Sequence, residues 1–195
     1  MDFRAWRRRI REYSEITNVG PVLRRYFVTA SFDGALTILG VITAALAFGA
    51  SESDKPLLVS SSIGAGIALA VSSAVGAFEV ERVEKKLDIR TIERAMLARL
   101  SEEHREAFRF ATIVSALVHG LAPILASTLA ILPFFFLDFR SAAIAAIAVI
   151  LTFLFSIGVY LGGLVRERVL LTGLRFTAAG IGTAVLLWLL GAPVP

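Results

Sequence analysis

Long uncharged apolar runs alternate with shorter polar connections along the chain. Five runs hold about 20 residues or more, the length that an α-helix needs to cross a bilayer at about 1.5 Å rise per residue. They extend over residues 28–50, 57–78, 110–137, 141–165 and 169–190. The pattern predicts an all-α, polytopic membrane protein with five transmembrane helices and a short cytoplasmic helical insertion between helices 2 and 3.

Composition supports the membrane as the solvent. Hydrophobic residues make up 56% of the 195 residues, which is above the usual share in soluble domains. The chain has no cysteine, so disulfides and thiolate metal sites are excluded. Any metal ligands must therefore be oxygen or imidazole groups.

Basic residues gather in two of the polar segments. Seven of the 20 lysines and arginines precede the first span and eight lie between the second and third spans. The loops after the first and third spans hold only Lys55 and Arg140, respectively, and Arg166 and Arg168 lie between the fourth and fifth spans. The positive-inside rule then predicts an integral membrane protein, in the cell membrane if the source is prokaryotic, with a cytoplasmic N-terminus and an external C-terminus.

The same patterns divide the chain into four regions. We expect a cytoplasmic basic amphipathic segment (1–25), transmembrane helices 1 and 2 (26–78), an acidic cytoplasmic helical region (79–109) and transmembrane helices 3 to 5 (110–195). In the first region, Phe3, Trp6 and Ile10 recur at helical spacing against a strip of arginines. This is typical of a helix lying on an anionic lipid surface, and nucleic acid is not an expected partner.

Residues 79–109 carry eight acidic and eight basic side chains and no proline or glycine. They predict two helices broken near Ser101, a good N-cap residue, with the second helix continuing into the third span. One interpretation is a solvated face with ion pairs between Glu81 and Lys85 and between Glu102 and Arg105. The other is a site for a divalent cation, because clustered carboxylates suit metals that accept oxygen ligands. Its candidate ligands are Glu81, Glu84, Glu102, Glu103 and Glu106.

Three ionisable residues, tyrosines aside, lie within the predicted spans: Asp33, His119 and Arg175. An ionised carboxylate in hydrocarbon costs roughly 2.5–3.5 kcal/mol even on the lenient insertion scale, so Asp33 is the first candidate for a functional role. A lone histidine more often bonds a neighbouring helix, and Arg175 is close enough to the cytoplasmic end of its span to snorkel. No catalytic motif is present, so an enzyme is not expected.

Four segments together resemble the vacuolar iron transporter family of plants and yeast. They read "SFDGALTILGVITAALAFGA", "GIALAVSSAVGAFEVERVEKK", "HGLAPILASTLAILPFFF" and "LTFLFSIGVYLGGLVRERVLLTGLRF". The resemblance covers nearly all of residues 26–191 in the same order, with an acidic insertion after the second span.

The resemblance implies a homodimeric secondary transporter without a prosthetic group. Its substrate would be Fe²⁺ or Mn²⁺, moved out of the cytoplasm in exchange for protons. Asp33 maps onto the family's metal and proton site in span one, and Glu79 is a candidate substitute ligand at the inner end of span two. The family also collects metal on cytoplasmic glutamates, whose nearest counterparts here are Glu81, Glu84, Glu102, Glu103 and Glu106.

One departure from the family concerns the metal. The family usually has a methionine in span two, where this chain has Ser72 and Ser73. Loss of the thioether favours harder ions, which makes Mn²⁺ a more credible substrate and removes a reason to expect selectivity for Fe²⁺.

Two alternatives follow from the residues themselves. One is a non-transporting membrane scaffold whose acidic helices bind a protein partner. The other is a carrier or channel for another cation, with Asp33 as a proton site.

The GxxxG pair Gly158 and Gly162 fits either a dimer interface or packing within one chain.

Overall fold

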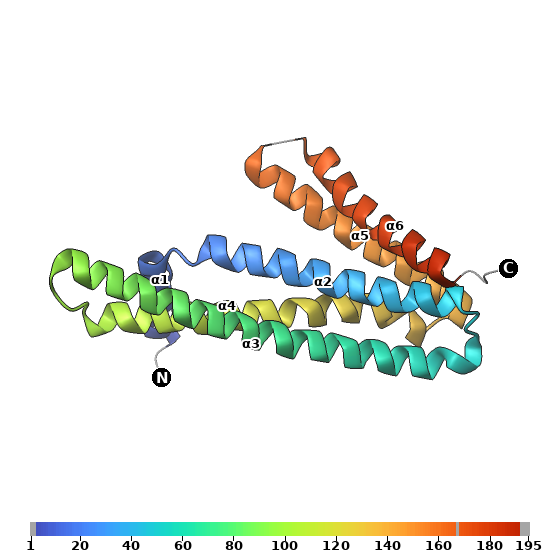
Figure 1. Ribbon diagram of the computed structural model, residues 1–195, viewed down its shortest axis with the longest axis horizontal. Coiled ribbons are helices and arrows are strands. Elements are labelled where there is room, and N and C mark those ends of the chain that lie inside the picture. Colours follow the sequence, from blue (N-terminus) through green and yellow to red (C-terminus); the bar gives the residue numbers. More distant parts are fainter. Residues whose placement is uncertain (1–2, 167, 192–195) are drawn as a thin grey trace. The chain divides into compact units, whose positions relative to one another are not determined.

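The computed structural model describes residues 3–166 and 168–191, and all regular elements within them are helices. The predicted all-α class is confirmed. The elements in chain order are α1 (Phe3–Thr17), α2 (Gly20–Ala47), η1 (Glu52–Asp54), α3 (Lys55–Met96), α4 (Glu102–Ile131), η2 (Leu132–Phe135), α5 (Phe139–Val165) and α6 (Val169–Gly191) (Figure 1). Helices α2 to α6 are long and apolar enough to cross a membrane, which is consistent with an integral membrane protein.

The chain forms two compact units, and the three helices α2, α3 and α4 each contribute to both. The first unit comprises the described part of Met1–Thr29 together with Ala70–Leu121. The second comprises Ala30–Leu69 and the described part of Ala122–Pro195.

In the first unit, α3 and α4 are joined by a short connection, Leu97–Ser101. Leu97 adopts a left-handed conformation, and the Glu93 carboxylate holds the turn by accepting from Leu100 N–H at 3.0 Å. Ser101 Oγ accepts from the backbone N–H of His104 at 3.5 Å, as an N-cap does. The predicted break near Ser101, and the continuation of the second helix into the third apolar run, are confirmed.

Helix α1 is also part of the first unit and packs against α4. The Tyr13 hydroxyl donates to Glu106 Oε2 at 2.7 Å, and its ring lies 5.8 Å from that of Phe110. The hydrogen bond to Glu106 raises the pKa of Tyr13. The chain therefore attaches its amphipathic N-terminal helix to the start of α4.

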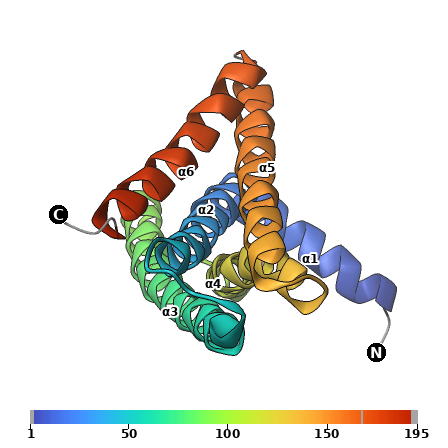
Figure 2. The ribbon, with the colours of Figure 1, turned by 90° about the vertical axis from the view of Figure 1, so that its right-hand side faces the viewer.

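In the second unit, α5 and α6 form a helical hairpin (Figures 1 and 2). A methyl group on Gly158 would lie 2.7 Å from Gly173 Cα, and one on Gly162 would lie 2.8 Å from Val169 Cα. Glycine is needed at both positions because the two backbones approach so closely. The GxxxG pair therefore serves packing within one chain.

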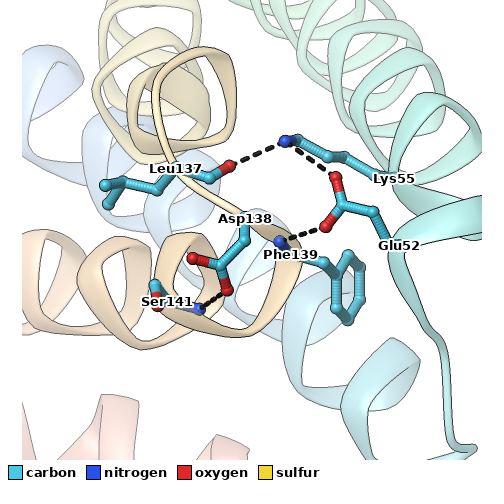
Figure 3. A network of polar contacts seen from close by, with 6 residues as sticks. All are labelled: Glu52, Lys55, Leu137, Asp138, Phe139 and Ser141. Atoms are coloured by element: carbon cyan, nitrogen blue, oxygen red, sulfur yellow. Dashed lines mark hydrogen bonds and ion pairs between the residues drawn. The ribbon is translucent and has the colours of Figure 1, made fainter.

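The connections α2–α3 and α4–α5 of the second unit are tied together by polar contacts (Figure 3). Glu52 accepts from Phe139 N–H, and Lys55 Nζ donates both to Glu52 at 3.1 Å and to the Leu137 carbonyl at 2.7 Å. Asp138 caps α5 by accepting from Ser141 N–H at 3.1 Å. These contacts fix the two turns against each other.

The Asp138 cap predicts a pH dependence of stability. The Ser141 N–H bond lowers the pKa of Asp138, so its contribution is present above the unfolded pKa, about 3.9, and is lost as the pH falls through the lower folded value. We expect the melting temperature of Asp138→Asn to lie below that of wild type at pH 6, with the gap closing below about pH 4. Thermal melts from pH 3 to 7 measure it; Glu12→Gln, on exposed α1, is the control. A gap of constant size would contradict the assignment.

Candidate functional site

Asp33 lies on an exposed face of α2, in the second unit. The Asp33 carboxylate makes no hydrogen bond or ion pair with the described residues. The Thr37 hydroxyl donates instead to the Asp33 backbone carbonyl, at 2.7 Å. Arg175 is also exposed and makes no ion pair within the part of the chain that the structure describes. Asp33 is therefore an open carboxylate on a helix that is long and apolar enough to span a membrane.

Gly34, the next residue, lies at a close contact between α2 and α4. A methyl group on Gly34 would lie 2.8 Å from Pro123 Cα and 3.1 Å from the Pro123 carbonyl oxygen. Helices α2 and α4 thus nearly touch through their backbones at this point. Asp33 lies about 100° around α2 from Gly34, away from this contact, and is exposed.

This close approach predicts that Gly34→Ala lowers stability by about 1–3 kcal/mol, because a backbone cannot move aside as a flexible side chain can. Gly64→Ala is the matched control, since a methyl group there meets no atom within 4 Å. We expect the control to be neutral or slightly stabilising. Thermal melts of both variants in the same detergent measure the difference, and equal melting temperatures would contradict the close approach.

Glu81 is the most unusual of the predicted site residues. It lies on α3 in the first unit with 1% of its surface exposed, and neither carboxylate oxygen has a hydrogen-bond partner among the described residues. It follows Ala70 and Ala77 on the buried face of α3. On this face a methyl group on Gly120 of α4 would lie 2.8 Å from Ala74 Cβ, so the two helices are tightly packed.

The neighbourhood of Glu81 includes Tyr26 of α2. The Tyr26 phenol and the Glu81 carboxylate are close enough to act on each other electrostatically. His119 Nδ1 lies 3.0 Å from the Tyr26 carbonyl oxygen, and the two rings are 4.7 Å apart. Since a carbonyl only accepts, Nδ1 carries the proton, and the prediction that His119 bonds a neighbouring helix is confirmed.

The remaining predicted carboxylates are exposed. Glu79 pairs with Arg82 at 2.7 Å and Glu106 accepts from Tyr13. Glu84, Glu102 and Glu103 make no ion pair or hydrogen bond through their carboxylates in the described residues. These groups can be reached from water.

The structure does not gather these carboxylates into a preformed metal site. Across residues 3–166 and 168–191, no group of three or more histidine, aspartate or glutamate side chains is close enough to hold a metal ion. The two ion pairs expected from helical spacing are not formed. Lys85 pairs with Asp88 at 3.4 Å instead of Glu81, and Arg105 pairs with Glu93 at 2.7 Å instead of Glu102. Lys85 Nζ also lies 5.8 Å from the centre of the Phe108 ring.

Sequence reasoning missed a set of buried hydroxyl groups. In the second unit, Ser31, Thr43 and Ser62 are buried with no hydrogen-bond partner in the part of the chain described. Ser127 is buried as well and donates to the Pro123 carbonyl at 2.6 Å. The only sequence signal was the frequency of serine and threonine within apolar runs, which close helix packing also explains.

Comparison with known proteins gives one relative and no family model that matches. The uncharacterized protein MJ0645 of the archaeon Methanocaldococcus jannaschii is 30% identical over 172 residues, which cover 85% of this chain and 87% of the relative. The similarity therefore extends over nearly the whole length of both proteins.

Proposed function

The chain belongs to the same family as MJ0645 of Methanocaldococcus jannaschii, which is uncharacterised, and from the residues of the chain itself we propose a transport function. The protein is a membrane carrier that exports Mn²⁺ or Fe²⁺ from the cytoplasm in exchange for protons. It works as a homodimer, with the N-terminus and the α3–α4 connection in the cytoplasm and the C-terminus outside.

The observation that carries this proposal is the buried carboxylate of Glu81. An isolated ionised carboxylate is expensive to bury, and among the described residues Glu81 has no ion pair and no hydrogen bond within 3.5 Å, with only the Tyr26 phenol near it. Two states of Glu81 avoid a bare charge: one in which a proton is bound and one in which a cation is bound. A group that exchanges these two occupants is what proton-coupled cation transport requires.

Asp33, in the second unit, supports the proposal as a second exchange site. On a single protomer its carboxylate is exposed on a helix that is long and apolar enough to span a membrane. Facing lipid it would be costly, but a second copy of the chain would cover it and bring a second Asp33 to the same place. The homodimer is proposed on this ground.

The exposed carboxylates Glu79, Glu84, Glu102, Glu103 and Glu106 act as the cytoplasmic capture surface. Their oxygen atoms suit Mn²⁺ at least as well as Fe²⁺. The sequence has methionine at positions 1 and 96 alone, so the predicted spans offer no thioether ligand. Since no three acids are preassembled within the described helices, capture is transient, and tight binding needs either a rearrangement or the partner subunit.

Metal-dependent stability tests this proposal. A ligand that binds only the folded protein raises the free energy of unfolding by about 2.7 kcal/mol at one hundred times its Kd. We expect micromolar Mn²⁺ to raise the melting temperature of the full chain in detergent, with Mg²⁺ at the same concentration having little effect. No shift with Mn²⁺ or Fe²⁺, or an equal shift with Mg²⁺, would contradict metal recognition and favour the acidic helices as a docking surface for a protein.

A further inference from the structure

The first unit contains a groove between α3 and α4 that the transport function does not use. Its volume is about 610 Å³, and its polar wall is strongly basic. Six of its lining residues carry positive charge and one, Glu93, carries negative charge. The basic residues are Arg82, Lys85, Lys86, Arg90, Arg105 and Arg109.

Three of these charges are held by partners and three are free. Arg82, Lys85 and Arg105 pair with Glu79, Asp88 and Glu93, respectively. By contrast, Lys86, Arg90 and Arg109 are exposed and form no ion pair within the described residues. In addition, Arg105 Nε is buried without an acceptor in the described part of the chain. The groove thus offers three positive charges that no described residue neutralises.

The remaining wall of the groove is apolar. Phe78, Ile89, Phe108 and Ile113 line it together with the basic residues. Phe78 is the last residue of the second apolar run, and Ile113 lies just inside the third, which begins at residue 110. The groove therefore begins where two membrane-length apolar runs give way to polar sequence.

We propose that this α3–α4 groove binds the headgroup of an anionic phospholipid. The phosphate lies among Lys86, Arg90, Arg109 and Arg105, and the glycerol and upper acyl chains lie on Phe78, Phe108 and Ile113. Basic pockets beside the cytoplasmic ends of membrane helices have the charge and position for this. A free phosphate ion would use the charges but leave the apolar wall without an occupant, so the observations favour a lipid.

The α3–α4 region then has two surfaces of opposite charge. Its exposed glutamates attract cations, whereas the groove between the same two helices attracts anions. A lipid bound there would link α3 to α4 where both leave the apolar runs, which should make the first unit more stable.

Lipid titration of the full chain in an uncharged detergent tests the groove. The probes are phosphatidylglycerol, phosphatidylcholine and inorganic phosphate, and the readouts are melting temperature and bound lipid by native mass spectrometry. The test variant is Lys86→Gln/Arg109→Gln. The matched control is Arg94→Gln/Arg99→Gln, which removes the same charge from the tip of the α3–α4 hairpin, outside the groove.

We expect phosphatidylglycerol, and not phosphatidylcholine, to stabilise the wild type, with about tenfold weaker binding in the test variant and little change in the control. Equal weakening in both variants would overturn the groove in favour of a diffuse charge effect. A shift of the same size with inorganic phosphate would overturn the lipid in favour of a free anion. No preference of the wild type for phosphatidylglycerol would overturn the proposal altogether. None of these outcomes depends on metal transport.

Discussion

Asp33→Asn is expected to reduce Mn²⁺ flux through reconstituted protein at least about 100-fold. The amide has nearly the shape of the carboxylate, but it takes up no proton and, being neutral, binds a divalent cation more weakly, so the exchange of occupants stops. A barrier increase of about 2.7 kcal/mol already corresponds to a hundredfold loss of rate. The measurement is uptake of Mn²⁺ into proteoliposomes, driven by an imposed pH gradient, and Asp33→Ala is measured in the same way.

The control for Asp33 is Asp88→Asn, which also removes one carboxylate from a long helix. Asp88 is exposed and pairs only with Lys85, and such a surface pair contributes little to stability. Its flux should stay within about twofold of wild type. Flux that survives in Asp33→Asn, in protein that is folded and inserted, would remove Asp33 from the transport path.

Glu81 should give the second large effect, with opposite signs in two assays. Glu81→Met removes a buried carboxyl group without a close hydrogen bond and fills the same space with apolar atoms, so we expect stability to rise by about 1–3 kcal/mol. Glu81→Gln keeps the shape of the side chain but removes the ionisable group. It should lower flux at least about tenfold, because a neutral amide cannot alternate between a proton and a cation. Both variants should therefore lose transport, and Glu81→Met should also melt at a higher temperature.

A combined gain of stability and loss of flux separates a functional carboxylate from a structural one. If Glu81 instead holds the fold together, Glu81→Met would melt at a lower temperature than wild type. Wild-type flux in Glu81→Gln would place the exchange site elsewhere. Asp88→Asn is again the control, because it lies on the same helix and loses the same charge.

The helices could be predicted from the sequence because their apolar runs are long and uncharged. Their ends could not be predicted as well. A helix after Phe78 was expected, but not that it is continuous with the second span: α3 runs unbroken to Met96, because residues 79–96 contain no proline or glycine and solvated charged side chains do not break a helix. Likewise α2 begins at Gly20, eight residues before residue 28, where the first apolar run begins.

Asp33 could be recognised from the sequence because a charge inside an apolar run is visible there. Glu81 could not be distinguished from its acidic neighbours. Its burial depends on how other helices pack against α3, a tertiary effect that spacing along one helix does not report. The basic groove was missed for a similar reason, since it needs residues from two helices that are joined at Leu97–Ser101.

The most direct test of the transport account is a coupled flux measurement on the wild-type protein. Proteoliposomes are loaded with a pH indicator, and Mn²⁺ movement and internal pH are followed together. The account predicts that an outwardly directed Mn²⁺ gradient drives protons inward, and that an imposed proton gradient drives Mn²⁺ the opposite way. Movement of Mn²⁺ without any change of internal pH, or no movement in well-folded protein, would contradict it.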